Sequence, residues 1–115
     1  MTGAPAAKSP LHTRVCDLFG VRYPIVQTGM GWVSGARLTA ATSAAGGLGI
    51  LAGVTMTLDE LSVAIETIQS QTDKPFGVNL RADQPGVDQI IDLIVERDGV
   101  IGIVLCNPML AEDPA

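Results

Sequence analysis

The chain has 115 residues and a formal net charge of −5, and 47% of its residues are hydrophobic. This is enough apolar sequence for the core of one small domain and too much for a disordered chain. Aromatic residues make up only 3%, and Lys and Arg form no cluster, so we exclude a base-stacking or phosphate-binding surface and expect no nucleic-acid partner.

The length of the apolar runs and the placement of the cysteines bear on location. The longest apolar runs, such as 100–106, are too short to cross a bilayer, so we expect no membrane partner. Residues 1–10 carry two prolines and one positive charge, which is typical of a flexible tail and not of a targeting segment. Cys16 and Cys106 lie far apart and fit no metal spacing. We interpret them as free thiols in a reducing compartment, and we predict a cytoplasmic protein without a metal site.

Short apolar runs separated by helical patterns predict four strands that alternate with three helices. The strands are expected at about 24–28, 48–51, 76–80 and 100–105. Their starting positions are 24, 28 and 24 residues apart, close to the roughly 30-residue length of a βαβ unit. No hairpin signal separates them, so the sequence predicts an α/β fold with a parallel sheet and right-handed crossovers.

The helices are predicted from caps and apolar spacing. Residues 13–19 form a short amphipathic segment with Val15, Leu18 and Phe19 on one side. The first of the three main helices, 36–45, is rich in alanine, and we expect Ser34 to cap its start. The glycine pair 46–47 should end it.

The second main helix opens with Thr57-Leu58-Asp59-Glu60, a Thr-x-x-Glu capping box. Apolar residues then recur at helical spacing, namely Leu58, Leu61, Ile65 and Ile68. The third helix is expected at 87–97, with Val87, Ile90, Ile91 and Ile94 directed inward. Acidic residues recur every four positions on this helix and should occupy a solvated face, namely Asp88, Asp92 and Glu96.

Parallel strands with helices between them fit two architectures. In an open doubly wound sheet the helices cover both faces, whereas in a (β/α)8 barrel they cover only the outside. A complete barrel takes about 250 residues, so this chain would be its amino-terminal half. Half a barrel leaves its first and last strands unpaired, and such edges favour self-association.

The turn 29–35, GMGWVSG, follows the first strand and precedes a helix, where α/β proteins bind ligands. Glycines on both sides of Met30 let the backbone approach a flat or anionic ligand. The spacing is one residue longer than a dinucleotide fingerprint, and no carboxylate ends the second strand, which argues against a Rossmann site. A purely structural tight turn stays open.

Three other residues, Asn79, Trp32 and His12, bear on the function of the chain. Asn79 stands near the carboxyl end of the third strand, where its amide either caps a neighbouring turn or bonds a ligand. Trp32 either lines a pocket or plugs one end of the sheet. His12, the only histidine, lies beside the flexible tail and is given no catalytic role.

The segments QTGMGWVSGARL, AGGLGIL and TDKPFGVNL resemble the amino-terminal part of the nitronate monooxygenase family, once called 2-nitropropane dioxygenases. The resemblance extends over about 18–80 and implies a TIM barrel that binds FMN non-covalently. It places the backbone of Gly29, Met30 and Gly31, and the side chain of Asn79, at the flavin. The implied reaction is oxidation of a nitronate by the flavin, after which the reduced flavin reacts with O2. The chain is also similar to a bacterial subgroup of flavin-dependent reductases or desaturases that act on acyl-CoA or acyl-carrier substrates.

The family's catalytic histidine and flavin-phosphate loops lie beyond residue 115, so we assign no catalytic residue. We expect a flexible tail at 1–12, a partial FMN-binding barrel of about four βα units at 13–108, and a carboxyl-terminal tail at 109–115. Three hypotheses follow. The chain is an amino-terminal enzyme fragment whose substrate is a nitronate or an acyl thioester, an inactive truncated product, or a small module that binds a nucleotide or a partner.

Overall fold

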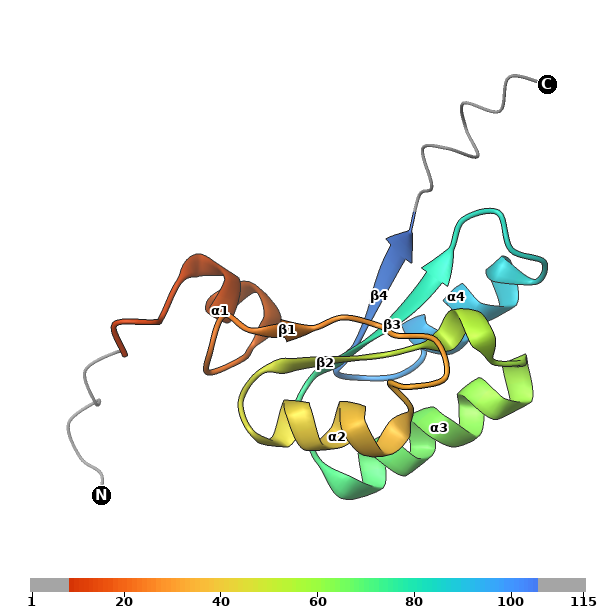
Figure 1. Cartoon of the computed structure of the whole chain (residues 1–115). Helices are drawn as coiled ribbons and strands as arrows, with labels where there is room; N and C mark the ends of the chain where they lie inside the picture. Colours follow the sequence, from red (N-terminus) through yellow and green to blue (C-terminus); the bar gives the residue numbers. More distant parts are fainter. Residues whose placement is uncertain (1–8, 106–115) are drawn as a thin grey trace.

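The computed structural model describes residues 9–105 (Figure 1). The helices are α1 (Arg14–Phe19), α2 (Ala36–Ala44), α3 (Leu58–Gln71) and α4 (Val87–Val95), with a 3-10 turn η1 (Gly53–Thr55). The strands are β1 (Val26–Gln27), β2 (Leu48–Leu51), β3 (Phe76–Arg81) and β4 (Val100–Leu105). The predicted order of elements is confirmed. The predictions for Cys106, for residues 1–8 and for everything after residue 105 lie outside the described part of the chain.

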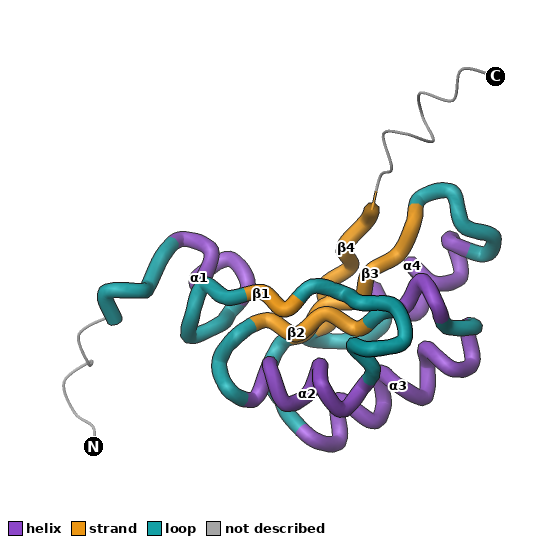
Figure 2. The backbone as a smooth tube through the Cα atoms, viewed as in Figure 1, coloured by secondary structure: helices purple, strands orange, loops and turns teal. Residues whose placement is uncertain are grey.

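The strands form one parallel sheet in the order β1-β2-β3-β4. The strand order follows the chain without reversing, as in a barrel and unlike a doubly wound sheet. Helices α2, α3 and α4 lie next to one another on one face of this sheet (Figure 1 and Figure 2). The prediction of consecutive βα units, as in the amino-terminal half of a TIM barrel, is therefore confirmed, and the open sheet with helices on both faces is excluded.

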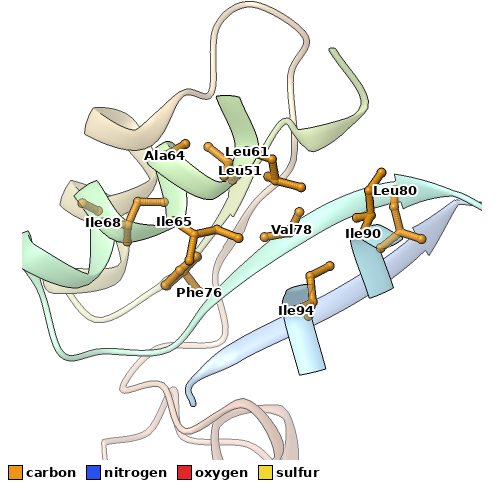
Figure 3. Close-up of a cluster of buried hydrophobic side chains, with 11 residues drawn as sticks. Leu51, Leu61, Ala64, Ile65, Ile68, Phe76, Val78, Leu80, Ile90 and Ile94 are labelled. Atoms are coloured by element: carbon orange, nitrogen blue, oxygen red, sulfur yellow. The ribbon is translucent and has the colours of Figure 1, made fainter. Parts of the chain in front are cut away.

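The hydrophobic core fills the space between the sheet and these helices (Figure 3). It combines one side of the strands with the inner faces of α3 and α4, through Leu51, Phe76, Val78, Leu80, Leu61, Ala64, Ile65, Ile68, Ile90 and Ile94. Burying a side chain of this size stabilises the fold by about 1.5–3 kcal/mol. This layer therefore fixes the positions of the strands and, with them, of the loops at the strand ends.

Helix α2 packs closely on β2 because the residues at the contact between them are small. A Cβ on Gly49 would lie 3.0 Å from the backbone carbon of Thr39, which leaves no room for a side chain there. Ala40 is 2% exposed at the same layer. The glycine stop is also confirmed, because Gly46 has a φ of +109° and the amides at 46 and 47 cap the last helical carbonyls.

The predicted cap of α2 is wrong. Gly35 is the N-cap residue, and no side chain bonds the first turn of the helix. Ser34 lies one residue earlier and uses its hydroxyl group to bond Met30 instead. The serine therefore stabilises the turn that precedes the helix.

Strand β1 is shorter than the predicted 24–28. The amide of Ile25 donates to the carbonyl oxygen of Tyr23 at 2.8 Å, so the chain is still turning where the strand was expected to begin. Regular pairing with β2 covers only Val26 and Gln27. The sheet consequently has a short strand at this edge.

The predicted apolar face of α1 is wrong, and the predicted face of α4 is confirmed at Val87, Ile90 and Ile94 but wrong at Ile91. In α1, Leu18 is 76% exposed and Val15 is 40% exposed, while Cys16 is the buried residue. In α4, Ile91 is 40% exposed although Ile90 and Ile94 are buried. The helical spacing groups apolar residues on one side of a helix. It does not show on which side a neighbouring element lies.

Candidate functional site

The carboxyl ends of the first three strands bring together the turn after β1, the turn η1 after β2, and Asn79 in β3. Figure 2 shows the loop that leaves β1 crossing over β2 towards β3. Because parallel strands end at the same edge of the sheet, residues far apart in the sequence meet here. We call these segments the loop cluster.

Asn79 is the side chain that joins the loop cluster. It is 7% exposed, and its Oδ1 accepts a hydrogen bond from the backbone amide of Val54 at 3.2 Å. Its Nδ2 faces Gly29, where an added Cβ would lie 2.8 Å from the Asn79 Cγ. Within residues 9–105, Nδ2 donates no hydrogen bond. One half of the amide thus caps a neighbouring turn, as one of the two predictions stated, and the other half keeps an unused donor.

The turn after β1 is held by Ser34, which is fully buried. The Met30 amide donates to Ser34 Oγ at 2.6 Å, and Ser34 Oγ donates to the Met30 carbonyl oxygen at 3.2 Å. The Ser34 carbonyl oxygen accepts from the Ala52 amide at 2.9 Å, which ties the turn to the end of β2. This role of Ser34 was not predicted, although a serine four residues after Met30 is typical of a side chain that bonds nearby backbone.

These bonds decide which backbone groups of the turn are available to a ligand. Both polar backbone groups of Met30 are engaged within the turn, and its side chain is 37% exposed. The amides of Gly29 and Gly31 donate to no other described residue. Gly31 lies against η1, since an added Cβ would be 3.2 Å from Thr55 Cγ2. The Trp32 amide likewise donates to no other described residue, so the free donors of the turn are the amides of Gly29, Gly31 and Trp32.

Trp32 lies at the tip of this turn with a φ of +59°, a left-handed conformation that bulky residues rarely adopt. Its side chain is 89% exposed. It therefore does not plug the end of the sheet, and that prediction is wrong, whereas a role in lining an open site stays a prediction.

The charged side chain at the end of β3 is already paired. Arg81 Nε and Nη2 donate to the Asp83 carboxylate at 3.0 and 3.1 Å. This hydrogen bonding raises the pKa of Arg81 and lowers the pKa of Asp83. Both groups are exposed enough to be screened by solvent, so the pair orders the loop after β3 and adds little stability.

The remaining titratable residues lie outside the loop cluster. His12 Nε2 is 2.9 Å from Asp17 Oδ1 of α1. The acidic residues of α4 and its end are solvent-exposed, as predicted for Asp88, Asp92 and Glu96. Over residues 9–105, no group of three or more His, Cys, Asp and Glu is placed to hold a metal ion. In the same part of the chain, no helix is long and apolar enough to cross a membrane.

Known proteins resemble this chain over most of its length. The family model named nitronate monooxygenase matches residues 12–98. The chain belongs to the nitronate monooxygenase family. The match covers every element of the loop cluster and ends just before β4.

Individual relatives of this family are longer than the chain. The chain is 57% identical over 90 residues to (3aS,4S,5R,7aS)-5-hydroxy-7a-methyl-1-oxo-octahydro-1H-indene-4-carboxyl-CoA dehydrogenase of Mycobacterium tuberculosis, covering 78% of this chain and 25% of that protein. It is 43% identical over 70 residues to a probable nitronate monooxygenase of Staphylococcus saprophyticus, covering 61% of this chain and 20% of that protein. The chain thus spans about a quarter or less of these curated relatives.

Among solved structures, FabK from Thermotoga maritima matches with a TM-score of 0.77 and 36% sequence identity. The match covers 90% of this chain and 33% of that structure. The likeness therefore extends over nearly the whole described fold.

Proposed function

We propose that this chain is the amino-terminal part of a flavin-dependent oxidoreductase, and that its loop cluster binds the ring of FMN. The observation that carries the proposal is the Asn79 amide, which is buried and keeps an unused Nδ2 donor beside Gly29. Asn79 Nδ2 has no acceptor among residues 9–105 and is not among the fully enclosed atoms, so it is open to an acceptor atom of a ligand. The flavin ring presents carbonyl oxygens and ring nitrogens as acceptors.

Each residue named from the family resemblance would act differently at the ring. Asn79 would donate from Nδ2, and Gly29 and Gly31 would donate from backbone amides. Met30 would contribute apolar contact from its half-exposed side chain, because its backbone groups are engaged by the turn. When bound, the flavin supplies the redox chemistry. The protein donors would orient the ring and favour negative charge on it.

We infer an acyl-CoA thioester with a fused-ring acyl group as the substrate class of the whole protein. The support is the identity of 57% to a CoA-thioester dehydrogenase against 43% to a probable nitronate monooxygenase. The second candidate is oxidation of nitronates with O2, which the nitronate monooxygenase family model supports. We retain residues 13–108 as the proposed partial barrel. We also retain a cytoplasmic location, because a free thiol such as that of Cys16 is typical of a reducing compartment.

The flavin proposal is tested by titrating the 115-residue chain into FMN and following flavin fluorescence. We expect saturable quenching, and we expect Asn79→Ala to weaken binding by about tenfold, the effect of one lost hydrogen bond. The matched control is Gln89→Ala on the exposed side of α4, which should bind as the parent does. Equal affinity of Asn79→Ala and the parent, or no quenching by a folded chain, would refute the assignment.

The substrate classes are separated by adding ligands to the chain saturated with FMN. A fused-ring acyl-CoA and a primary nitronate are titrated over the same range of concentrations. The acyl-CoA should perturb the visible flavin spectrum at a lower concentration than the nitronate does. The reverse order would favour the nitronate candidate. This outcome is independent of whether FMN itself binds at Asn79.

A further inference from the structure

Trp32 is held in a backbone conformation that its own side chain disfavours. Within residues 9–105 it is the one residue other than glycine with a positive φ, and its φ of +59° lies in the left-handed region. In that region the Cβ atom of an L-residue crowds a neighbouring carbonyl oxygen, whereas glycine adopts it freely. The turn fixes this conformation, because the amides of Val33 and Ser34 both donate to the Met30 carbonyl oxygen at 2.9 Å. The strain therefore arises within the described turn and does not depend on any further part of the protein.

Packing inside the described fold does not explain Trp32 either. Its side chain is 89% exposed, so the indole adds almost nothing to the core. Backbone conformation and exposure thus both disfavour a tryptophan at this position. Strained residues of this kind cluster at active sites and ligand-binding loops, where the surrounding structure holds them in place. What the indole contributes is therefore a contact with something outside the turn.

The place of Trp32 in the loop cluster indicates what it contacts. Exposure increases from the floor of the cluster to the tip of the turn, since Asn79 is 7% exposed, Met30 is 37% exposed and Trp32 is 89% exposed. The proposed flavin donors begin at the floor, at Asn79 and Gly29, and the free Trp32 amide continues them to the tip. Because this amide and the indole belong to one residue, a ligand along these donors lies within reach of the indole, whatever follows residue 105. A substrate that lies on the flavin ring occupies the space between floor and tip.

We propose that the Trp32 indole is the apolar wall that recognises the ring system of the substrate's acyl group. This inference rests on the proposed function, since it takes the flavin from the loop cluster and the fused-ring acyl thioester from the relatives. An indole offers a large, rigid apolar face, which suits a fused carbocycle and makes little contact with a small acyl group. Trp32 is thus a specificity residue that discriminates between thioesters by the size of the acyl group. A contact between Trp32 and a further part of the protein predicts no such discrimination.

The test compares two thioesters that share the CoA part, octahydroindene-carboxyl-CoA and acetyl-CoA. Calorimetry of the 115-residue chain, with and without FMN, gives the affinity for each thioester, and the ratio of the two affinities is the ring preference. We expect Trp32→Gly to lower the ring preference about tenfold, the effect of losing one large apolar contact. Trp32→Phe keeps an aromatic face and should keep most of the preference. The affinity for FMN should be unchanged in both variants, because the indole lies beyond the flavin donors at the floor.

Stability gives a second readout that a purely structural tryptophan would not give. Trp32→Gly should raise the midpoint of urea unfolding, because glycine relieves the left-handed strain. The matched control is Val33→Gly, at a neighbouring residue that is 63% exposed and has no positive φ. Its midpoint should fall, because glycine there only adds freedom to the unfolded chain. Its ring preference should equal that of the parent, since Val33 lines a hollow beside α2 instead of the loop cluster.

The outcomes separate this inference from the flavin assignment. An unchanged ring preference in Trp32→Gly, or a parent chain without a ring preference, would overturn the specificity role of Trp32 even where FMN binds. A midpoint that falls as much in Trp32→Gly as in Val33→Gly would also overturn it, because Trp32 would then support the fold. A chain that shows the ring preference, loses it in Trp32→Gly and binds no FMN would refute the flavin assignment and support the role of Trp32.

Discussion

Two glycines of the loop cluster, Gly29 and Gly53, are explained by one neighbouring residue, Asn79. Gly29 gives space to the Asn79 side chain, and Gly53 gives space to its backbone, since a Cβ on Gly53 would lie 2.7 Å from the Asn79 carbonyl oxygen. Asn79 in turn caps the turn at Val54. The loops after β1 and β2 are therefore positioned by contacts with the same residue of β3. A side chain at either glycine would move the proposed flavin donors.

Gly29→Ala is expected to lower the free energy of unfolding by about 1–3 kcal/mol, because the new methyl group overlaps the buried Asn79 amide. Gly102→Ala is the matched control, since its Cβ would meet no atom closer than 3.8 Å. Urea unfolding followed by circular dichroism measures both. A similar loss of stability in the two variants would show that Asn79 does not restrict position 29.

At the scale of elements, α3 shows how local sequence and packing cooperate. Its capping box is formed as predicted: the Glu60 amide donates to Thr57 Oγ1 at 3.2 Å, and the Thr57 amide donates to the Glu60 carboxylate at 3.0 Å. The inner face of the helix supplies Leu61, Ile65 and Ile68 to the core. The cap satisfies amides that have no partner within the helix, and the apolar face determines which side lies on the sheet.

Thr57→Ala should destabilise the chain at pH 7 by about 1 kcal/mol, the usual effect of losing an N-cap side chain. The hydrogen bond from the Thr57 backbone lowers the pKa of Glu60 in the folded state. The stabilisation from Glu60 is therefore present above its ordinary pKa of 4.5 and is lost as the pH falls through the lower folded value.

The measurement for this prediction is thermal unfolding of both proteins between pH 7 and pH 3. The difference between the parent and Thr57→Ala should be smaller at the acid end, because the variant lacks the Thr57 hydroxyl, whose side-chain hydrogen bond also lowers the pKa of Glu60. Thr67→Ala, in the middle of the same helix, is the control and should show no such trend. A difference that stays constant with pH would contradict the role of Glu60.

The whole described molecule depends on a single core layer between the sheet and its helices. Within residues 9–105, the opposite face of the sheet carries no second layer of helices (Figure 1). Stability is therefore concentrated in the core residues of α3, β3 and α4. A domain of this size has a total stability of only about 5–15 kcal/mol, so one core substitution is a large fraction of it.

Ile65→Ala should remove about 2–5 kcal/mol, because Ile65 is fully buried at the centre of this layer. Ile91→Ala makes the same chemical change at a residue that is 40% exposed, and it should cost well under half as much. Both are measured by urea unfolding at one protein concentration, because association would add to stability. Equal losses would show that the core extends to the border of α4.

Several features of this protein are determined by sequence over short distances. The runs 48–51 and 100–105 are continuously apolar and bounded by turn residues, so the limits of β2 and β4 were predicted correctly. The capping box of α3 and the glycine stop of α2 need only neighbouring residues. The three family segments lie in order along the chain, and the family model confirms them.

Other features were decided only by tertiary structure, because they depend on which segments lie side by side. The strand order and the placement of the helices on one face distinguish the half-barrel from an open sheet. Neither feature can be read from a local sequence pattern. The exposure of Ile91 reflects the absence of a neighbour beyond α4 within the described chain, although its spacing is that of a core residue. The hydroxyl of Ser34 bonds Met30 because the turn folds back, and the amide of Asn79 meets Gly29 across β2 because parallel strands end at the same edge.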